Sequence, residues 1–167
     1  MMKDFVMLCG PSGSGKTSWA IEQINYNPSK TKYVSRDEIR FSLLKENESY
    51  FNKEKDVVRK FINELQKGID DKEIETIIAD ATHLNPKSRN NVFSRLARLD
   101  SCTVYAINFF VPKEICLKRN SRRNGLAKVP DNVIERQFRS YKPAVENENE
   151  KFKIRVINLP HEPQYER

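Results

Sequence analysis

The chain contains few cysteines and few glycines, and it has no long hydrophobic segment. Its 167 residues include three cysteines, Cys9, Cys102 and Cys116, and each lies in an apolar segment. This odd number argues against a disulfide framework or a zinc site, and it predicts small core residues in a reducing compartment. No segment approaches the roughly 18 apolar residues of a membrane span, and the first residues lack the pattern of a secretory signal. We therefore expect a cytoplasmic protein with no membrane partner.

The sequence also lacks internal repeats, linkers and low-complexity segments. We expect one domain with a full hydrophobic core, residues 1–158, followed by a loosely attached tail, residues 159–167, which contains two prolines. The chain has 30 lysines and arginines against 23 aspartates and glutamates, a formal net charge of +7. This charge favours a polyanionic partner or substrate, although the binding of a nucleotide alone would account for some of it.

Most of the glycines lie in one short segment, residues 10–17, whose sequence is Gly-Pro-Ser-Gly-Ser-Gly-Lys-Thr. The segment fits the P-loop pattern G-x-x-x-x-G-K-[ST] at every fixed position. The apolar residues 5–9 before it predict a buried strand, and residues 18–24 after it predict the first turns of a helix. A loop between a strand and a helix is the context in which backbone N–H groups and the helix N-terminus can bind phosphates.

This P-loop predicts a site for ATP and Mg²⁺. We expect the side chain of Lys16 to reach the β- and γ-phosphates and the hydroxyl group of Thr17 to bind the metal. A flexible Gly/Ser turn is the ordinary alternative, but such a turn does not require Lys-Thr after its last glycine. The predicted ATP-binding residues are Gly10, Ser12, Gly13, Ser14, Gly15, Lys16 and Thr17.

Strand-like and helix-like segments alternate along the rest of the chain, which is typical of an α/β fold with a mostly parallel sheet. Gly68 is expected to end one helix, and Asn85 and Pro86 are expected to open the next as its cap and first residue. Further helices are expected from about Pro112 and from Pro130. The expected strands are residues 5–9, 32–34, 74–80, 103–110 and 154–157.

A well-specified helix start follows the second expected strand. Ser35 and Glu38 have the spacing of a capping box, and Val34 and Ile39 have the spacing of a hydrophobic staple. Asp37 would then be the second residue of the helix.

Asp37 and Arg40 are three positions apart and share one face of this helix. They follow a strand, at the edge where ligands bind in open α/β sheets. Asp37 would accept the proton of an attacking hydroxyl group, and Arg40 would bind an anionic part of the acceptor. In the alternative interpretation, Asp37 only complements the helix dipole and Arg40 is an ordinary surface charge. The local sequence leaves both interpretations open.

A basic segment, residues 112–128, contains six lysines and arginines and a single acidic residue. Arg119 and Arg123 would lie one helical turn apart and point the same way. With an Asn-Gly hinge after them, they predict a lid at about residues 119–129 that closes over the triphosphate and supplies positive charge. A solvated charged surface is the alternative.

The order of these motifs is similar to a known family. The P-loop, S-R-D-E-I-R, I-I-A-D-A-T-H-L-N-P and L-K-R-N-S-R-R followed by K-V-P closely resemble the 5′-kinase domain of bacteriophage polynucleotide kinase-phosphatase and related kinase domains of nucleic-acid repair enzymes. The resemblance extends from about Lys3 to Tyr141. It implies a P-loop kinase fold with a central parallel sheet of five strands in the order 2-3-1-4-5, helices on both faces and an arginine-bearing lid.

The resemblance also implies a role for each matching residue. The residue matching Asp37 is the general base for the 5′-hydroxyl group, and the residue matching Arg40 binds the phosphate 3′ to the acceptor nucleoside. The residue matching Asp80 helps to organise the acceptor side. The other catalytic residues that it implies are Lys16, Arg119 and Arg123, with Thr17 as the metal ligand.

Two features depart from the phage pattern. One extra residue separates Asp80 from Leu84, and the lone His83 between them is expected to be a surface residue. The chain also has no D-x-D motif, which the phage phosphatase domain carries, so we expect no 3′-phosphatase activity.

The sequence thus predicts a kinase that transfers the γ-phosphate of ATP to the 5′-hydroxyl end of RNA or DNA, with Mg²⁺, in nucleic-acid repair. One alternative is a kinase for a small metabolite or antibiotic, because a fold and a P-loop do not choose an acceptor. Another is a nucleotide-binding module of a larger complex with no turnover of its own. The preference for RNA or DNA and the oligomeric state stay open.

Overall fold

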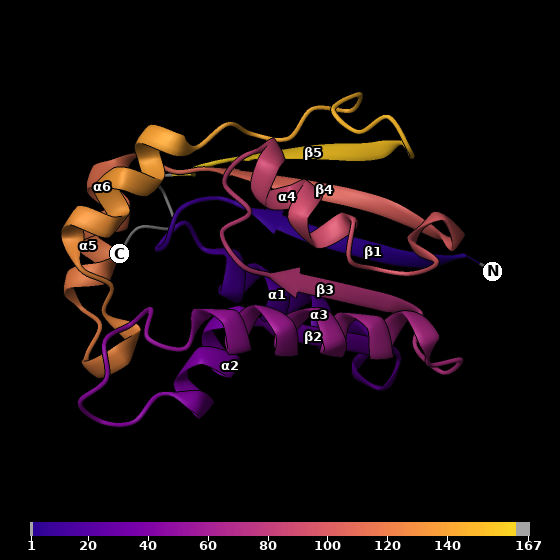
Figure 1. Ribbon diagram of the computed structural model, residues 1–167. Coiled ribbons are helices and arrows are strands. Elements are labelled where there is room, and N and C mark those ends of the chain that lie inside the picture. Colours follow the sequence, from indigo (N-terminus) through magenta and orange to yellow (C-terminus); the bar gives the residue numbers. More distant parts are fainter. Residues whose placement is uncertain (1, 163–167) are drawn as a thin grey trace.

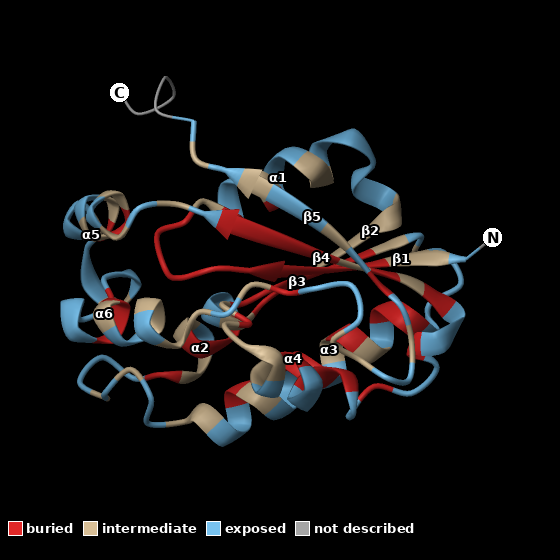
Figure 2. Cartoon of the chain, turned by 90° about the horizontal axis from the view of Figure 1, so that it is seen from above, coloured by how far each residue is buried: buried red, intermediate tan, exposed pale blue. Residues whose placement is uncertain are grey.

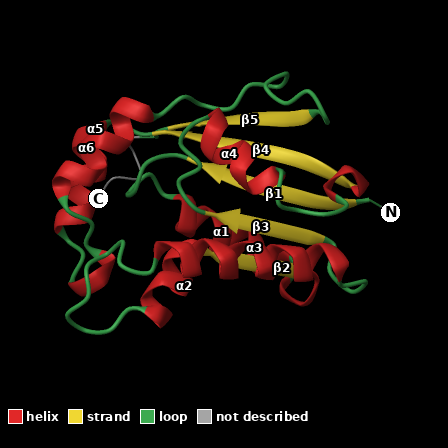
Figure 3. Cartoon of the chain, viewed as in Figure 1, coloured by secondary structure: helices red, strands yellow, loops and turns green. Residues whose placement is uncertain are grey.

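The computed structural model describes residues 2–162, which form a single parallel sheet flanked by helices (Figures 1 and 3). The spatial order of the strands is β2-β3-β1-β4-β5, and every neighbouring pair is parallel. This order and the five-stranded parallel sheet confirm the predicted α/β P-loop kinase fold. The strands are β1 (Lys3–Cys9), β2 (Thr31–Ser35), β3 (Thr76–Asp80), β4 (Cys102–Phe110) and β5 (Ile154–Pro160).

Helices cover both faces of the sheet, as predicted. Figure 2 shows α1 on one face, α2, α3 and α4 on the other, and α5 and α6 beyond the carboxyl ends of the strands. Within residues 2–162, no helix is long and apolar enough to cross a membrane. The helices are α1 (Lys16–Tyr26), α2 (Arg36–Leu43), α3 (Glu54–Asp70), α4 (Pro86–Phe93), α5 (Lys113–Ser121) and α6 (Asp131–Ser140).

The core lies on both sides of the central strand β1. Phe5 and Met7 pack into the cluster that contains the buried side chains of α3 and α4, whereas Val6 and Leu8 pack into the cluster under α1. A strand buried on both faces requires a continuous apolar run, and this is the run that residues 5–9 supply. The three cysteines are free and buried, as predicted for core residues.

Local capping signals predicted the start of two helices correctly. The Ser35 side chain accepts a hydrogen bond from the Glu38 backbone N–H (3.1 Å), and Asn85 caps α4 with Pro86 as its first residue. Val34 and Ile39 are both buried in the same core cluster, as the staple requires. The start of α2, which carries Asp37, is therefore stabilised both by the hydrogen bond of the cap and by the apolar staple.

Gly68 does not end a helix, because α3 continues through it to Asp70. A Cβ at this position would approach Ile77 Cγ1 and Lys32 Cγ to 3.0 Å each. A side chain here would require Ile77 and Lys32 to shift, so glycine allows the close approach of α3 to strands β2 and β3. The sequence analysis interpreted this glycine as a helix end, whereas it lies where the helix packs closely on the sheet.

The last strand is longer than expected. Leu159 pairs with Phe109 and Pro160 with Phe110 in β5, whereas the sequence predicted a loose tail from residue 159. The backbone N–H of His161 also donates to the carbonyl of Phe110 (2.8 Å). The remainder of the expected tail, residues 163–167, lies outside the described residues.

Candidate active site

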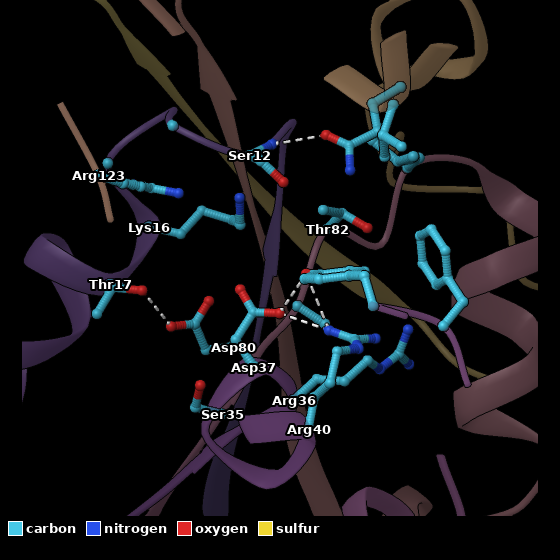
Figure 4. A pocket seen from close by; sticks show the side chains of 18 of the residues that line it. Ser12, Lys16, Thr17, Ser35, Arg36, Asp37, Arg40, Asp80, Thr82 and Arg123 are labelled. Carbon is cyan, nitrogen blue, oxygen red and sulfur yellow. Dashed lines mark hydrogen bonds and ion pairs between the residues drawn. The ribbon is translucent and has the colours of Figure 1, made fainter. Parts of the chain in front are cut away.

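A pocket of about 400 Å³ opens at the carboxyl ends of the strands, between the P-loop, α2, the end of β3 and α6 (Figure 4). It brings together most of the residues that the sequence predicted. Gly10, Ser14 and Arg119 are not in its lining. The predicted residues that line it are Ser12, Gly13, Gly15, Lys16, Thr17, Asp37, Arg40, Asp80 and Arg123.

The P-loop connects β1 to α1 in a conformation that depends on glycine. Gly13 and Gly15 have φ angles of +84° and +92°, in the left-handed region that favours glycine. A Cβ on Gly13 would also lie 2.8 Å from the backbone oxygen of Cys116 in α5. The Ser12 backbone N–H donates to Gln137 Oε1 of α6 (2.9 Å), so α5 and α6 both pack against the loop.

Lys16 folds back over its own loop. Its ammonium group donates to the carbonyls of Gly10 and Pro11, both at 2.8 Å, and to Ser14 Oγ at 3.3 Å. Burial lowers the pKa of Lys16, whereas the nearby carboxylates of Asp80 and Asp37 act in the opposite direction. The partners of this buried cation are thus neutral oxygen atoms of the loop.

Asp80 lies at the end of β3, directly beside α1. Its Oδ2 atom accepts hydrogen bonds from Thr17 Oγ1 (2.9 Å) and from the hydroxyl group of Tyr33 (2.5 Å). Burial and the neighbouring Asp80 raise the pKa of Tyr33, which keeps that hydroxyl protonated as a donor. The resemblance assigned Asp80 to the acceptor side, but its contact places the carboxylate on the expected metal ligand.

The oxygen atoms of Thr17 and Asp80 are the ligand type that Mg²⁺ prefers. Among residues 2–162, no group of three histidine, cysteine, aspartate or glutamate side chains could hold a metal on its own. A magnesium ion here would therefore need ligands from nucleotide phosphates as well, as in other P-loop sites.

Asp37 faces the pocket at the start of α2 and is held by two donors (Figure 4). Arg40 Nη1 and the hydroxyl group of Tyr50 both donate to its Oδ1 atom, at 2.5 Å and 2.8 Å. No hydrogen bond of the described residues involves the other oxygen, Oδ2. Its side chain is 51% exposed, so one oxygen is fixed and the other is accessible from the pocket.

Arg40 is a buried member of this network, with a side chain only 4% exposed. Its Nε and Nη2 atoms donate to the Glu54 carboxylate, and its guanidinium group stacks over the Tyr50 ring at 4.4 Å. Every nitrogen of the guanidinium group therefore has a protein partner. The prediction named a phosphate as the partner of Arg40 and missed Tyr50 and Glu54, which are ten and 14 positions away.

Arg36, the first residue of α2, also lines the pocket. Its Nε atom is buried without a hydrogen-bond partner among the described residues, and its guanidinium group lies 4.8 Å from the centroid of Phe61. Burial lowers the pKa of Arg36, and the charge of Glu54 opposes this effect. Arg36 was part of the S-R-D-E-I-R motif, but the helical spacing from Asp37 pointed to Arg40 and not to Arg36.

The two lid arginines do not share a helical face. Arg119 lies in the last turn of α5 and donates to the Gly13 carbonyl (2.9 Å), whereas Arg123 lies beyond the helix end at Ser121 and lines the pocket. The prediction was wrong because it extended the helical period past the end of α5. Asn120 binds both backbone groups of Val129 and so ties the two ends of this segment together.

The inner face of α6 was missed altogether. Val133, Arg136, Gln137 and Ser140 all line the pocket. Their spacing of three, four and seven positions is that of one helical face, and this pattern was visible in the sequence. This face of α6 adds Arg136 to the arginines that line the pocket.

His83 is not a surface residue, contrary to expectation, because its side chain is 1% exposed. It has a φ of +40°, and its Nδ1 atom lies 2.6 Å from the Leu8 carbonyl. Burial lowers its pKa to about 3, so the ring is neutral. The ring fastens the loop after β3 to the central strand and is not in the pocket lining.

A strand, P-loop and helix with a lysine and a threonine at the loop end define a nucleotide site of the P-loop kinase type. A family model described as an AAA domain matches residues 5–146, and the chain belongs to this family. The P-loop kinase fold implies that the chain binds a nucleotide.

Solved structures share the fold at low sequence identity. A fungal RNA kinase matches with a TM-score of 0.69 and 15% identity over 95% of this chain and 38% of its own. A chain of the Pnkp1/Rnl/Hen1 RNA repair complex matches with a TM-score of 0.66 and 18% identity over 90% of this chain and 50% of its own. A sugar kinase from Janibacter sp. HTCC2649 matches with a TM-score of 0.63 and 16% identity, over 98% and 89%. The chain thus spans half or less of the two RNA-related chains.

Proposed function

We propose that the protein is an ATP-dependent polynucleotide kinase that phosphorylates the 5′-hydroxyl end of RNA or DNA. The observation that carries this proposal is the position of Asp37. Its unpaired carboxylate oxygen faces the same pocket as Lys16 and Thr17 of the P-loop, with the arginines of α2 around it. A hydroxyl group on Asp37 would thus face a phosphate held by the P-loop, as a direct transfer requires.

The donor half would bind ATP by an exchange of partners. The γ- and β-phosphates would replace the Gly10 and Pro11 carbonyls as partners of the Lys16 ammonium group. Thr17, oriented by Asp80, would hold the magnesium ion, which neutralises charge on the phosphate oxygens when bound. Asp80 would therefore act through Thr17, beside the metal.

Asp37 would orient the acceptor hydroxyl group and receive its proton at Oδ2. The bond between the 5′-oxygen and the γ-phosphorus forms while the bond from that phosphorus to the β–γ bridging oxygen breaks, and ADP leaves. A loose transition state of this kind asks the base mainly for orientation. The contacts of Arg40 and Tyr50 with Oδ1 supply that orientation.

The remaining arginines would balance the negative charges of the two substrates. Arg123 lines the pocket beside the P-loop and would bind the triphosphate. Arg119 would add positive charge from its position beside the Gly13 carbonyl. The resemblance assigns the acceptor phosphate to Arg40. We assign this phosphate to Arg36 instead, because Arg40 is already bound to carboxylates and Arg36 has no hydrogen-bonded partner among the described residues.

A small-molecule kinase is the second candidate. The sugar kinase with the same fold, which this chain covers to 89%, favours it. A nucleotide-binding module without turnover is disfavoured by the position of Asp37, which a binding module would not need. The positive net charge favours the polynucleotide acceptor over both.

Transfer of label from [γ-³²P]ATP to matched oligonucleotides tests this proposal. RNA and DNA with a 5′-hydroxyl end should be labelled, and the same oligonucleotides with a 5′-phosphate should not. Removal of the label by a 5′-phosphatase locates it at the 5′ end. No transfer to any 5′-hydroxyl oligonucleotide, with transfer to a sugar or a similar alcohol, would establish the second candidate instead.

A further inference from the structure

Phe51 is an exposed aromatic residue in the lining of the active-site pocket, with 45% of its surface accessible. The other large hydrophobic residues that are exposed in residues 2–162 do not line this pocket. Phe51 also belongs to none of the hydrophobic core clusters in the described part of the chain. A phenylalanine ring that the core does not use, and that lines a pocket, is available to a flat apolar partner from outside the protein.

The position of Phe51 is tied to the catalytic carboxylate through Tyr50. The two rings meet edge to face, with centroids 4.8 Å apart and an interplanar angle of 84°. Tyr50 is itself fixed by its hydrogen bond to Asp37 and by the Arg40 guanidinium group over its ring. The same guanidinium group lies 5.8 Å from the centroid of Phe51. Phe51 therefore lies one side chain away from the group that would hold the acceptor hydroxyl.

The segment that carries Phe51 is held in place at several points. Lys53 Nζ donates to the Leu43 carbonyl at the end of α2, and Asn52 N donates to Ser49 O. The ring is thus presented to the pocket by a structured connection between α2 and α3. A preformed aromatic surface binds a flat partner at a lower entropic cost than a mobile one.

We propose that Phe51 stacks on the nucleobase of the acceptor's 5′-terminal nucleotide, an inference that rests on the proposed polynucleotide kinase function. That base is attached to the same sugar as the hydroxyl group held by Asp37, so the two contacts belong to one nucleotide. Stacking on an aromatic ring is independent of base identity, because every base has a π-face. The pocket would thus require a base at the end of the strand without selecting which one. A sugar or another simple alcohol has no flat aromatic face and would gain nothing from Phe51.

Rates with a 5′-hydroxyl oligonucleotide and with the same oligonucleotide lacking its first base test this inference. In the wild type, the loss of the base should lower kcat/KM about 5- to 150-fold, the range of a single stacking contact. Phe51→Ala should lower kcat/KM by the same factor on the intact acceptor and leave the abasic acceptor unchanged. Phe51→Trp should restore the preference for the base, and Phe51→Leu should not.

Tyr26→Ala is the matched control, because Tyr26 is an exposed aromatic residue outside the pocket and should affect neither acceptor. Stabilisation by ATP should be equal in all variants, which shows that each one folds. Equal wild-type rates on the two acceptors, or an equal loss on both in Phe51→Ala, would overturn the stacking role while leaving the kinase function intact. If the wild type labels no oligonucleotide, the proposed function fails and this inference fails with it.

Discussion

Lys16 and Arg40 are the buried cations of the two halves of the pocket, and they are held in different ways. Lys16 is bound by neutral oxygen atoms of its own loop, whereas Arg40 is bound by two carboxylates, those of Glu54 and Asp37. The bonds of Lys16 carry a full charge on the donor alone, whereas those of Arg40 also gain the attraction between opposite charges. The donor half therefore holds a cation that a phosphate can take over. In the proposed reaction, the acceptor half holds a cation whose bond to Asp37 would orient the base.

Replacement of Lys16, the cation that a phosphate can take over, should have the largest effect on ATP binding and on activity. Lys16→Ala should abolish most of the stabilisation by ATP, which is about 2.7 kcal/mol at 100 times Kd for the wild type. Kinase activity should fall by about three orders of magnitude, since the transferred phosphate loses its main cationic partner. Thermal unfolding with and without Mg²⁺-ATP measures the first effect, and Lys72→Ala, an exposed lysine, is the control. An unchanged ATP response in Lys16→Ala would mean that the loop is not a working P-loop.

A change at the base should separate turnover from donor binding. Asp37→Asn keeps the size of the side chain but cannot accept a proton, so kcat should fall about 10²-fold or more. Stabilisation by ATP should stay at the wild-type level, because the donor half is untouched. Glu38→Gln, at the next position of α2, is the matched control and should retain activity. Near wild-type turnover in Asp37→Asn would leave this residue only a role in complementing the helix dipole.

Substitutions of Arg40, whose guanidinium nitrogens all have protein partners, and of Arg36, whose Nε atom has none among the described residues, should depend differently on the acceptor. Arg40→Gln should lower kcat/KM equally for a nucleoside and for its 3′-monophosphate, because it acts through Asp37. Arg36→Gln should impair only the 3′-monophosphate, by about 10- to 150-fold for one charge-assisted bond. Steady-state kinetics with the two acceptors measures both effects. A loss confined to the 3′-monophosphate in Arg40→Gln would instead make Arg40 the phosphate ligand, as the sequence resemblance implies.

An increase in salt concentration should lower the affinity for the acceptor more than the affinity for ATP. This effect should be smaller than those of the substitutions above. If the acceptor half contacts two backbone phosphates of a single strand, its affinity should fall about 7-fold between 50 and 200 mM salt. The ATP affinity should change less, because its phosphates are held largely by backbone groups and a buried lysine. Titrations of each ligand over this range provide the measurement. An acceptor affinity that does not change with salt would argue against contacts with the phosphate backbone.

The donor half was predictable because its signals are local. Glycines, Lys16 and Thr17 lie in one loop, and the cap at Ser35 fixed the next helix by contacts within three residues. The strand order came from the resemblance and not from the residues themselves. These features depend on backbone geometry and short-range hydrogen bonds, which a sequence displays directly.

The acceptor half was predicted only in part because its contacts are made by packing. The pairing of Arg40 with Glu54 depends on how α2 meets α3, and the place of Arg123 depends on where α5 ends. The role of Gly68 and the burial of His83 likewise follow from the close approach of distant segments. Spacing rules apply within one element, so they miss contacts that form between elements.

A competition between two acceptors in one reaction decides whether the protein phosphorylates polynucleotides or small molecules. The protein is incubated with [γ-³²P]ATP, a 5′-hydroxyl oligonucleotide and an excess of a sugar such as glucose, and the label in each product is counted. The oligonucleotide should take nearly all of the label, and Asp37→Asn should abolish this transfer. Label that goes mainly to the sugar would contradict the polynucleotide assignment.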